Sequence, residues 1–104
     1  MFGWGVATVT ADELARKLEH GRHVIIDVRE PSEFATGHVP SSVNVPLGLL
    51  AQEIGALDAR AETYVICQSG SRSVTGVRIL KRAGFEHAFS VKGGTSAWHG
   101  RLVR

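Results

Sequence analysis

The sequence lacks several features that mark particular classes of protein. It has one cysteine, Cys67, which excludes an intramolecular disulfide, so nothing in the chain requires an oxidising compartment. Its apolar runs are only a few residues long, far below the length of a membrane-spanning helix. The first ten residues have neither the basic nor the apolar region of a secretory signal peptide. These absences predict a soluble, cytoplasmic protein that does not contact a membrane.

Basic residues are neither numerous nor clustered. The formal net charge is +2 and the pI is about 9.1, which would weakly favour small anionic substrates. Neighbouring basic residues such as Lys81 and Arg82 fit a solvated helix face, and no basic run is interleaved with aromatic residues. The five histidines have no metal-ligand spacing and no second cysteine to join them. The sequence therefore predicts neither nucleic-acid binding nor a metal site.

The chain has the size and composition of one globular domain. It has 104 residues, of which 43% are hydrophobic and 21% charged. Short β-prone runs alternate with helical patterns along the chain. Strands are predicted at residues 6–9, 23–28, 42–45, 63–67 and 88–91, and helices near residues 10–21, 31–37, 47–57, 72–83 and 94–99. This alternation predicts a single α/β domain, residues 1–104, with a central parallel sheet flanked by helices on both faces.

Particular residues mark the ends of the first two predicted helices. Thr10 and Glu13 have the spacing of a capping box, and Gly21 is a natural stop for the helix that they begin. Pro31 suits the first turn of the next helix, and Gly37 suits its end. Both helices therefore begin soon after a predicted strand, as an alternating α/β chain requires.

The lone cysteine stands where the most β-prone run, residues 63–67, gives way to a loop. In parallel sheets, sites form beyond the carboxyl ends of strands, where the next helix presents its N-terminus. The residues that follow Cys67 are small or polar, so their N–H groups can turn inward as an anion cradle; they are Gln68, Ser69, Gly70, Ser71 and Arg72. Such a field favours the reactive thiolate. By position alone Cys67 would be a small buried hydrophobe, but this loop favours a functional thiol.

Three segments of the chain together fit one known pattern. Residues 24–46 include Asp27, Arg29 and His38, residues 67–73 read CQSGSRS, and residues 91–98 read VKGGTSAW. In this order and spacing they resemble the signatures of the single-domain rhodanese-like sulfurtransferases. The resemblance implies a compact α/β fold and an enzyme without a cofactor. It also implies the substrates, a small sulfane-sulfur donor such as thiosulfate or a persulfide and a cyanide, thiol or protein acceptor.

The resemblance further implies roles for individual residues. Cys67 would be the catalytic nucleophile and would carry the transferred sulfur as a persulfide. The five residues from Gln68 to Arg72 would form the substrate-binding loop, mainly through main-chain groups. The Arg72 guanidinium would orient the donor or brace the loop. Asp27 and Arg29 would either support the neighbouring loops or contact the substrate.

The same residues leave alternatives to a thiosulfate enzyme. Related phosphatases and arsenate reductases place five residues between cysteine and arginine, whereas four separate Cys67 from Arg72 here, which disfavours phosphoryl chemistry. Some well-studied thiosulfate enzymes of the family carry basic side chains where this chain has Ser69 and Glu33, so a different donor is an alternative. The domain could also be a non-catalytic module, or a sulfur carrier that acts through a protein partner.

Overall fold

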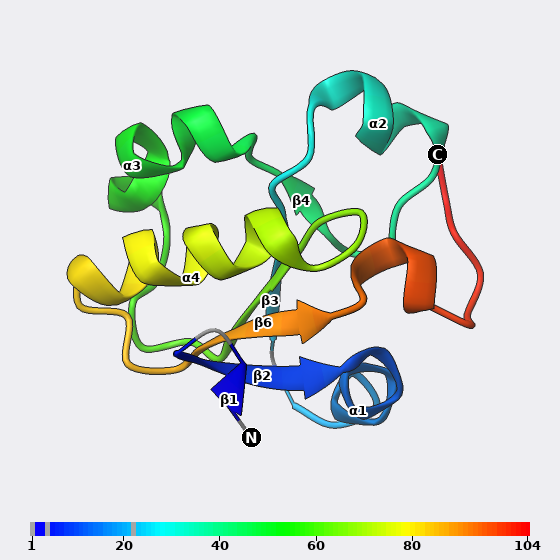
Figure 1. Cartoon of the computed structure of the whole chain (residues 1–104), viewed down its shortest axis with the longest axis horizontal. Helices are drawn as coiled ribbons and strands as arrows, with labels where there is room; N and C mark the ends of the chain where they lie inside the picture. Colours follow the sequence, from blue (N-terminus) through cyan, green and yellow to red (C-terminus); the bar gives the residue numbers. More distant parts are fainter. Residues whose placement is uncertain (1, 4, 22) are drawn as a thin grey trace.

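The sheet contains the strands that the sequence predicts, with one more at its edge. The computed structural model describes residues 2–3, 5–21 and 23–104, and in this part of the chain six strands form one sheet in the order β1-β2-β6-β5-β3-β4 (Figure 1). The strands are β1 (Phe2–Gly3), β2 (Val6–Thr10), β3 (Val24–Asp27), β4 (Val43–Asn44), β5 (Thr63–Ile66) and β6 (Ala88–Lys92). The added strand β1 pairs antiparallel with β2, and the other neighbours pair in parallel. The predicted parallel sheet is therefore confirmed.

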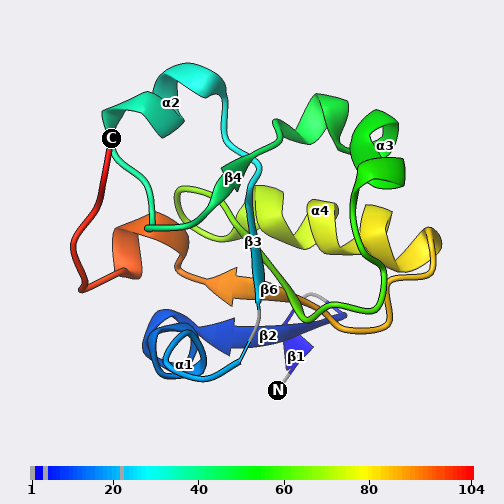
Figure 2. The ribbon, with the colours of Figure 1, turned by 180° about the vertical axis from the view of Figure 1, so that it is seen from behind.

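Helices cover both faces of the sheet (Figure 2). The helical segments are α1 (Ala11–Lys17), α2 (Pro31–Thr36), η1 (Leu47–Leu49), α3 (Leu50–Glu53), η2 (Ile54–Ala56), α4 (Ser71–Arg82) and η3 (Gly94–Ala97). Successive side chains of a strand point to opposite faces, so Val65 packs in the core under α4 and Ile66 in the core next to α1. The two-sided covering predicted from the alternation is confirmed. Among the described residues, no helix is long and apolar enough to cross a membrane.

The first helix begins as predicted and ends earlier. The Glu13 amide donates to the Thr10 hydroxyl at 3.0 Å, and the Thr10 amide donates to the Glu13 carboxylate at 2.9 Å, which completes the capping box. However, α1 ends at Lys17 with Leu18 as its C-cap. Gly21, at φ +77°, lies in the turn before β3 and is not the helix stop.

The segment 47–57 keeps its predicted apolar face but is not one helix. Leu50, Ile54 and Leu57 all pack on the core under α4. The backbone is divided into the single turn η1, the short helix α3 and the single turn η2. Gly48 and Gly55 lie in the two 3-10 turns, and glycine is a poor helix former because it loses the most backbone entropy. The segment 94–99 is likewise shorter than predicted, a 3-10 turn that ends at Ala97.

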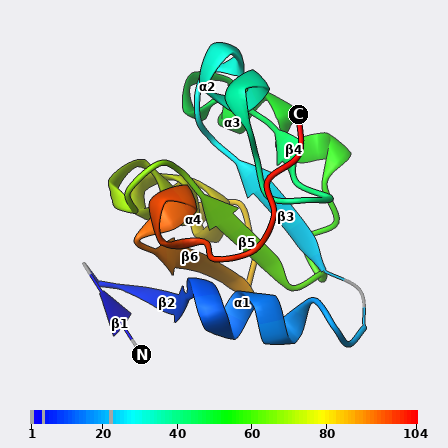
Figure 3. The same cartoon turned by 90° about the vertical axis from the view of Figure 1, so that its right-hand side faces the viewer.

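The parallel pairing brings three chain segments to one edge of the sheet. Strands β3, β5 and β6 are neighbours, with Asp27 level with Ile66 and Val65 level with Ser90. Figure 3 shows the C-terminal segment returning past this edge toward α2, where the backbones of His38 and Val103 form a bridge. The ends of β3, β5 and β6 and the loops that follow them are therefore the place where a site can form.

Candidate active site

Cys67 follows directly after β5 and lies beneath the N-terminus of α4. The residue is fully buried and belongs to the core cluster on that face of the sheet. Its sulfur accepts hydrogen bonds from the Gly70 amide at 3.1 Å and the Ser73 amide at 3.4 Å. The Ser73 hydroxyl oxygen lies 3.6 Å from the same sulfur. The loop therefore curls around the thiol with main-chain N–H groups directed at the sulfur, as the sequence predicted.

The surroundings of Cys67 have opposing effects on its ionisation. Burial is the largest influence and raises the pKa, because the anion would lose its hydration. The Ser73 hydroxyl and the amides of Ser73, Gly70 and Ser69 lower the pKa by hydrogen bonding to the anion, and together they outweigh burial. The pKa of Cys67 therefore lies below its ordinary value. The positive end of α4, which begins at Ser71, acts in the same direction.

A second hydroxyl lies behind the first. The Ser90 Oγ of β6 is 2.7 Å from the Ser73 Oγ, and both residues are buried. The Ser73 hydroxyl also lies within donating distance of the Gly70 carbonyl, at 3.1 Å. Two serines from α4 and β6 thus form a polar contact on the core side of the Cys67 sulfur.

The start of the loop is fastened to η3, which follows β6. The Cys67 carbonyl accepts from the Thr95 amide at 2.8 Å and from the Thr95 hydroxyl at 3.2 Å. The Gln68 carbonyl accepts from the Ser96 amide at 3.0 Å. Gly94 has φ +57°, and a Cβ atom there would overlap with the Cys67 carbonyl oxygen. The tight turn before η3 is therefore in direct contact with the loop, and the position of Gly94 accepts only glycine.

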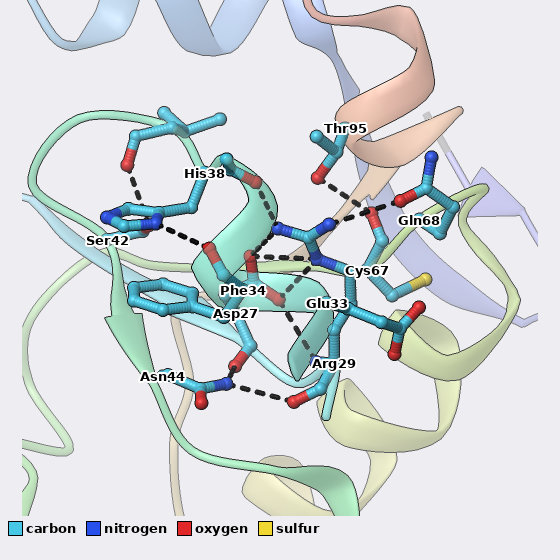
Figure 4. A network of polar contacts seen from close by, with 12 residues as sticks. Asp27, Arg29, Glu33, Phe34, His38, Ser42, Asn44, Cys67, Gln68 and Thr95 are labelled. Atoms are coloured by element: carbon cyan, nitrogen blue, oxygen red, sulfur yellow. Dashed lines mark hydrogen bonds and ion pairs between the residues drawn. The ribbon is translucent and has the colours of Figure 1, made fainter. Parts of the chain in front are cut away.

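A buried ion pair lies on the other side of the loop, at the end of β3. Arg29 donates to the Asp27 carboxylate through Nη2 at 2.9 Å and through Nε at 3.0 and 3.1 Å, and both residues are buried. Its remaining donors reach the Gln68 side-chain oxygen at 3.1 Å and the Gly37 carbonyl at 2.8 Å. Figure 4 shows the Cys67 sulfur directed away from this guanidinium. The pair therefore contacts the loop through Gln68 and does not touch the thiol.

Arg72, the last loop residue, points toward α2. Its two terminal nitrogens donate to the two Glu33 carboxylate oxygens at 2.7 and 2.9 Å. The Arg72 guanidinium, together with the Glu30 amide, lowers the pKa of Glu33 to about 2. The positive charge at the edge of the loop is therefore neutralised, and α2 is tied to the first turn of α4.

The predicted loop residues divide into three groups. Ser69 and Gly70 direct their amides at the sulfur. The Gln68 side chain accepts from Arg29 of the buried ion pair, and the Arg72 side chain forms an ion pair of its own with Glu33. Ser71 is exposed and begins α4. Within the described part of the chain, no group of three His, Cys, Asp or Glu residues could hold a metal ion.

Sequence reasoning did not single out Ser73, Ser90 or Thr95. Ser90 had a signal, because it is a polar residue inside the apolar run AFSV, where a strand buried on both faces has little room for one. Ser73 is three residues after Gly70, so it falls in the first turn of the helix with its amide free to turn to an acceptor. Thr95 binds the Cys67 carbonyl, which is 28 positions away, and sequence spacing does not predict a contact between such distant segments.

The chain is thus an α/β domain with helices on both faces of a parallel sheet and a buried cysteine in an amide-lined loop at the sheet edge. A comparison with known protein families identifies the family to which this domain belongs. The family described as "Rhodanese-like domain" matches residues 10–101. The chain therefore belongs to the rhodanese-like domain family, and the resemblance drawn from its three segments is confirmed.

Individual relatives agree with this assignment. "Putative sulfur carrier protein YrkF" of Bacillus subtilis is 38% identical over 77 residues, which are 74% of this chain and 42% of that protein. The chain thus spans less than half the length of this relative. A rhodanese-like domain protein from Staphylococcus aureus is 31% identical, with a TM-score of 0.86 and coverage of 94% and 98%. The human single-domain sulfurtransferase TSTD1 is 26% identical, with a TM-score of 0.83 and coverage of 90% and 96%.

Proposed function

We propose that this protein, acting as a single domain of residues 1–104, is a sulfurtransferase in which Cys67 carries the transferred sulfur as a persulfide. The observation that carries the proposal is the Cys67 sulfur itself, which faces the amides of Gly70 and Ser73 and has a lowered pKa. The same amides suit an anionic persulfide as well as a thiolate, because both place negative charge on sulfur in the loop. Membership of the rhodanese-like family supports sulfurtransferase chemistry in general terms.

The reaction has two displacement steps on sulfur. In the first step, the Cys67 thiolate attacks the outer sulfur of a donor such as thiosulfate. The Cys67–sulfur bond forms while the bond to the sulfite group breaks, and sulfite leaves with the electron pair. In the second step, cyanide or a thiolate attacks the outer persulfide sulfur, and thiocyanate or a new persulfide leaves while the Cys67 thiolate returns. The sulfur atom is passed on unchanged, so the cycle needs no oxidant, reductant or cofactor.

The remaining predicted residues act on Cys67 through the loop. The amides of Ser69 and Gly70 bind the anion directly. Asp27 and Arg29 are supporting residues in this proposal, because their buried pair reaches the loop through the Gln68 side chain. Arg72 braces the loop against α2 in its bond to Glu33, and it can orient an anionic donor only when that bond opens.

A second candidate function is that of a sulfur carrier that receives its sulfur from a partner protein. The observation that favours it is the Arg72–Glu33 pair, which leaves the loop without a free positive charge at that position to attract thiosulfate. The relative named as a sulfur carrier in Bacillus subtilis points in the same direction. A persulfide on a protein or small thiol needs less positive charge in the site than a dianion does. In both candidate functions the sulfur is held on Cys67.

The test is an intact-mass measurement after exposure to thiosulfate, to a low-molecular-weight persulfide and to a persulfidated protein, each followed by cyanide. We expect the mass to rise by one sulfur atom and to return after cyanide. Cys67→Ser removes the only thiol and should abolish both changes. Thr75→Ala, an exposed hydroxyl on α4, is the matched control and should load as the unaltered protein does.

The pattern of loading separates the candidates. Loading from thiosulfate supports the small-donor enzyme, and loading from the protein donor alone supports the carrier. A protein that gained no sulfur from any of the three donors would contradict both and leave the domain as a non-catalytic module. Loading that persisted in Cys67→Ser would contradict the role given to Cys67.

A further inference from the structure

Two hydroxyl groups occupy a part of the core where apolar side chains would be expected. Ser73 and Ser90 are 0% and 1% exposed, and their oxygens are 2.7 Å apart. Ala88, two residues before Ser90 on the same strand face, belongs to the apolar cluster under α4. Burying a hydroxyl is costly unless it is hydrogen-bonded, so a pair of serines at this place calls for a physical reason.

Counting hydrogen atoms fixes the direction of the hydrogen bond between the two serines. The Ser73 hydroxyl has one hydrogen and three possible acceptors within reach, namely the Gly70 carbonyl, the Ser90 oxygen and the Cys67 sulfur. If Ser73 donated to Ser90 or to the carbonyl, the sulfur anion would lose this hydrogen bond. The Ser73 hydrogen is free for the sulfur only when Ser90 acts as the donor in the contact between the two serines.

We propose that Ser90 is a positioning residue for Cys67. The Ser90 hydroxyl donates to the Ser73 oxygen, and the Ser73 hydroxyl then donates to the sulfur anion. When Cys67 is a neutral thiol, the hydrogen bond between Cys67 and Ser73 reverses its direction. The S–H group then donates to the Ser73 oxygen, and the Ser73 hydroxyl hydrogen turns to the Gly70 carbonyl. Chains of hydroxyl groups polarise one another in a medium of low dielectric constant, so the Ser90 contact strengthens the bond from Ser73 to the sulfur.

The two arginines nearest the loop are each engaged in an ion pair. From α4, Arg72 is paired with Glu33 of α2. From β3, Arg29 is paired with Asp27, and Figure 4 shows the Cys67 sulfur directed away from it. The segments that pack on the loop from β6 and η3 contribute hydroxyl and amide groups. The hydroxyl chain is therefore a separate means of stabilising the anion from the core side of the loop.

This inference rests on the proposed function only in taking the thiolate as the reactive form, and its test needs no sulfur donor. The pKa of Cys67 is measured from the pH dependence of alkylation by iodoacetamide, because Cys67 is the only thiol and only the thiolate reacts. The variants are Ser90→Ala, Ser73→Ala, the double variant Ser73→Ala/Ser90→Ala, and Ser90→Thr, which keeps a hydroxyl. Thr63→Val is the control, since it removes a buried hydroxyl at the opposite end of the neighbouring strand β5.

The expected result is a specific pattern of pKa values. Ser90→Ala should raise the pKa of Cys67 by about 0.2 to 0.4, because the hydrogen bond from Ser73 to the sulfur remains but loses the strengthening that Ser90 provides. Ser73→Ala should raise the pKa further, and the double variant should match Ser73→Ala, since Ser90 acts only through Ser73. Ser90→Thr and Thr63→Val should titrate as the unaltered protein does.

Two results would overturn the inference. One is a pKa of Cys67 that does not change in Ser90→Ala although it rises in Ser73→Ala. The other is a double variant whose pKa rise equals the sum of the two single rises, which would make the serines independent. Both results are read from folded protein without sulfur transfer, so a failure of the proposed sulfurtransferase function would leave this measurement intact.

Discussion

Glu33 neutralises the positive charge of Arg72 at the edge of the loop. Its carboxylate binds the Arg72 guanidinium through two hydrogen bonds, and both side chains are about one-third exposed, at 34% and 36%. Arg72 is the nearest positively charged side chain to Cys67 along the chain, so its pairing decides whether an anionic donor meets a cation there. We therefore propose that this carboxylate sets the preference of the site between dianionic and less charged donors.

Replacement of Glu33 by glutamine should therefore improve the use of thiosulfate. The amide oxygen can still accept from the Glu30 amide, which keeps the capping box of α2, while the charge on Arg72 is released. We expect the KM for thiosulfate in the loading reaction to fall about three- to tenfold, which corresponds to roughly 1 kcal/mol. Glu53→Gln, an equal charge change on the exposed side of α3, is the control. Equal KM values in the two variants would rule out this role.

The same pair contributes to stability in a defined pH range. The pKa of Glu33 is about 2 in the folded protein against an ordinary value of 4.5, first because of the Arg72 hydrogen bonds and then because of the Glu30 amide. A depressed folded-state pKa stabilises the protein fully above pH 4.5, and the contribution is lost as the pH falls toward 2. The pair is partly exposed, so we expect less than about 1 kcal/mol. Urea denaturation at pH 7 and pH 3 should show a smaller difference for Glu33→Gln than for the unaltered protein.

At the scale of elements, local sequence patterns predicted most strands and helices, and the end of α2 at Gly37, but neither the end of α1 nor the division of segment 47–57. The capping box of α1 depends on residues three apart, so the sequence contains all of it. The end of α1 depends on how the chain turns back to reach β3, and Gly21 serves that turn and not the helix. The division of segment 47–57 also depends on tertiary packing. The core requires that Leu50, Ile54 and Leu57 lie on one face, and this does not require a continuous helix.

The candidate site was predictable to a similar extent. Cys67 and its loop are contiguous, so their strand-loop-helix arrangement could be inferred from the chain itself. Ser90 of β6 contacts Ser73 of α4 across 17 positions of the chain, and Thr95 of η3 contacts Cys67 across 28 positions. Such contacts follow from the order of strands in the sheet, with β6 next to β5, which the alternation of elements does not specify.

The turn between β6 and η3 gives a prediction at the element scale. Gly94→Ala would place a Cβ atom on the Cys67 carbonyl and impose a left-handed backbone on a non-glycine residue. We expect a loss of about 2 to 4 kcal/mol in the free energy of unfolding, measured by urea denaturation. Gly48→Ala in η1 is the control, since its Cβ would meet nothing within 4 Å, and should change stability by less than about 0.5 kcal/mol.

The loop of the Gly94→Ala variant should also be displaced. In folded protein at low temperature, we expect slower sulfur loading than in Gly48→Ala, because the clash is with the carbonyl of the loading residue itself. If Gly94→Ala retained both full stability and the normal loading rate, the close approach of η3 to the loop would contribute neither to stability nor to sulfur loading.

At the scale of the whole molecule, Arg29 joins three parts of the chain. Its guanidinium binds Asp27 at the end of β3, the Gly37 carbonyl after α2, and the Gln68 side chain in the loop. The Gln68 amide group in turn donates to Ser96 in η3 at 2.9 Å. One buried cation therefore connects the β3 end, the α2 end and, through Gln68, the turn after β6.

Replacing Arg29 separates its contribution to stability from its contribution to the site. Arg29→Met leaves the Asp27 carboxylate buried without its partner, and we expect a loss of about 3 to 5 kcal/mol in urea denaturation. Asp27→Asn/Arg29→Met removes both charges and keeps an oxygen acceptor for the residue 29 amide, so about 2 kcal/mol should return. Sulfur loading should be slow in the double variant as well as in Arg29→Met, because in both the Gln68 side chain lacks the hydrogen bond from Arg29. A double variant that regained stability and full loading rate together would reduce Arg29 to a folding role alone.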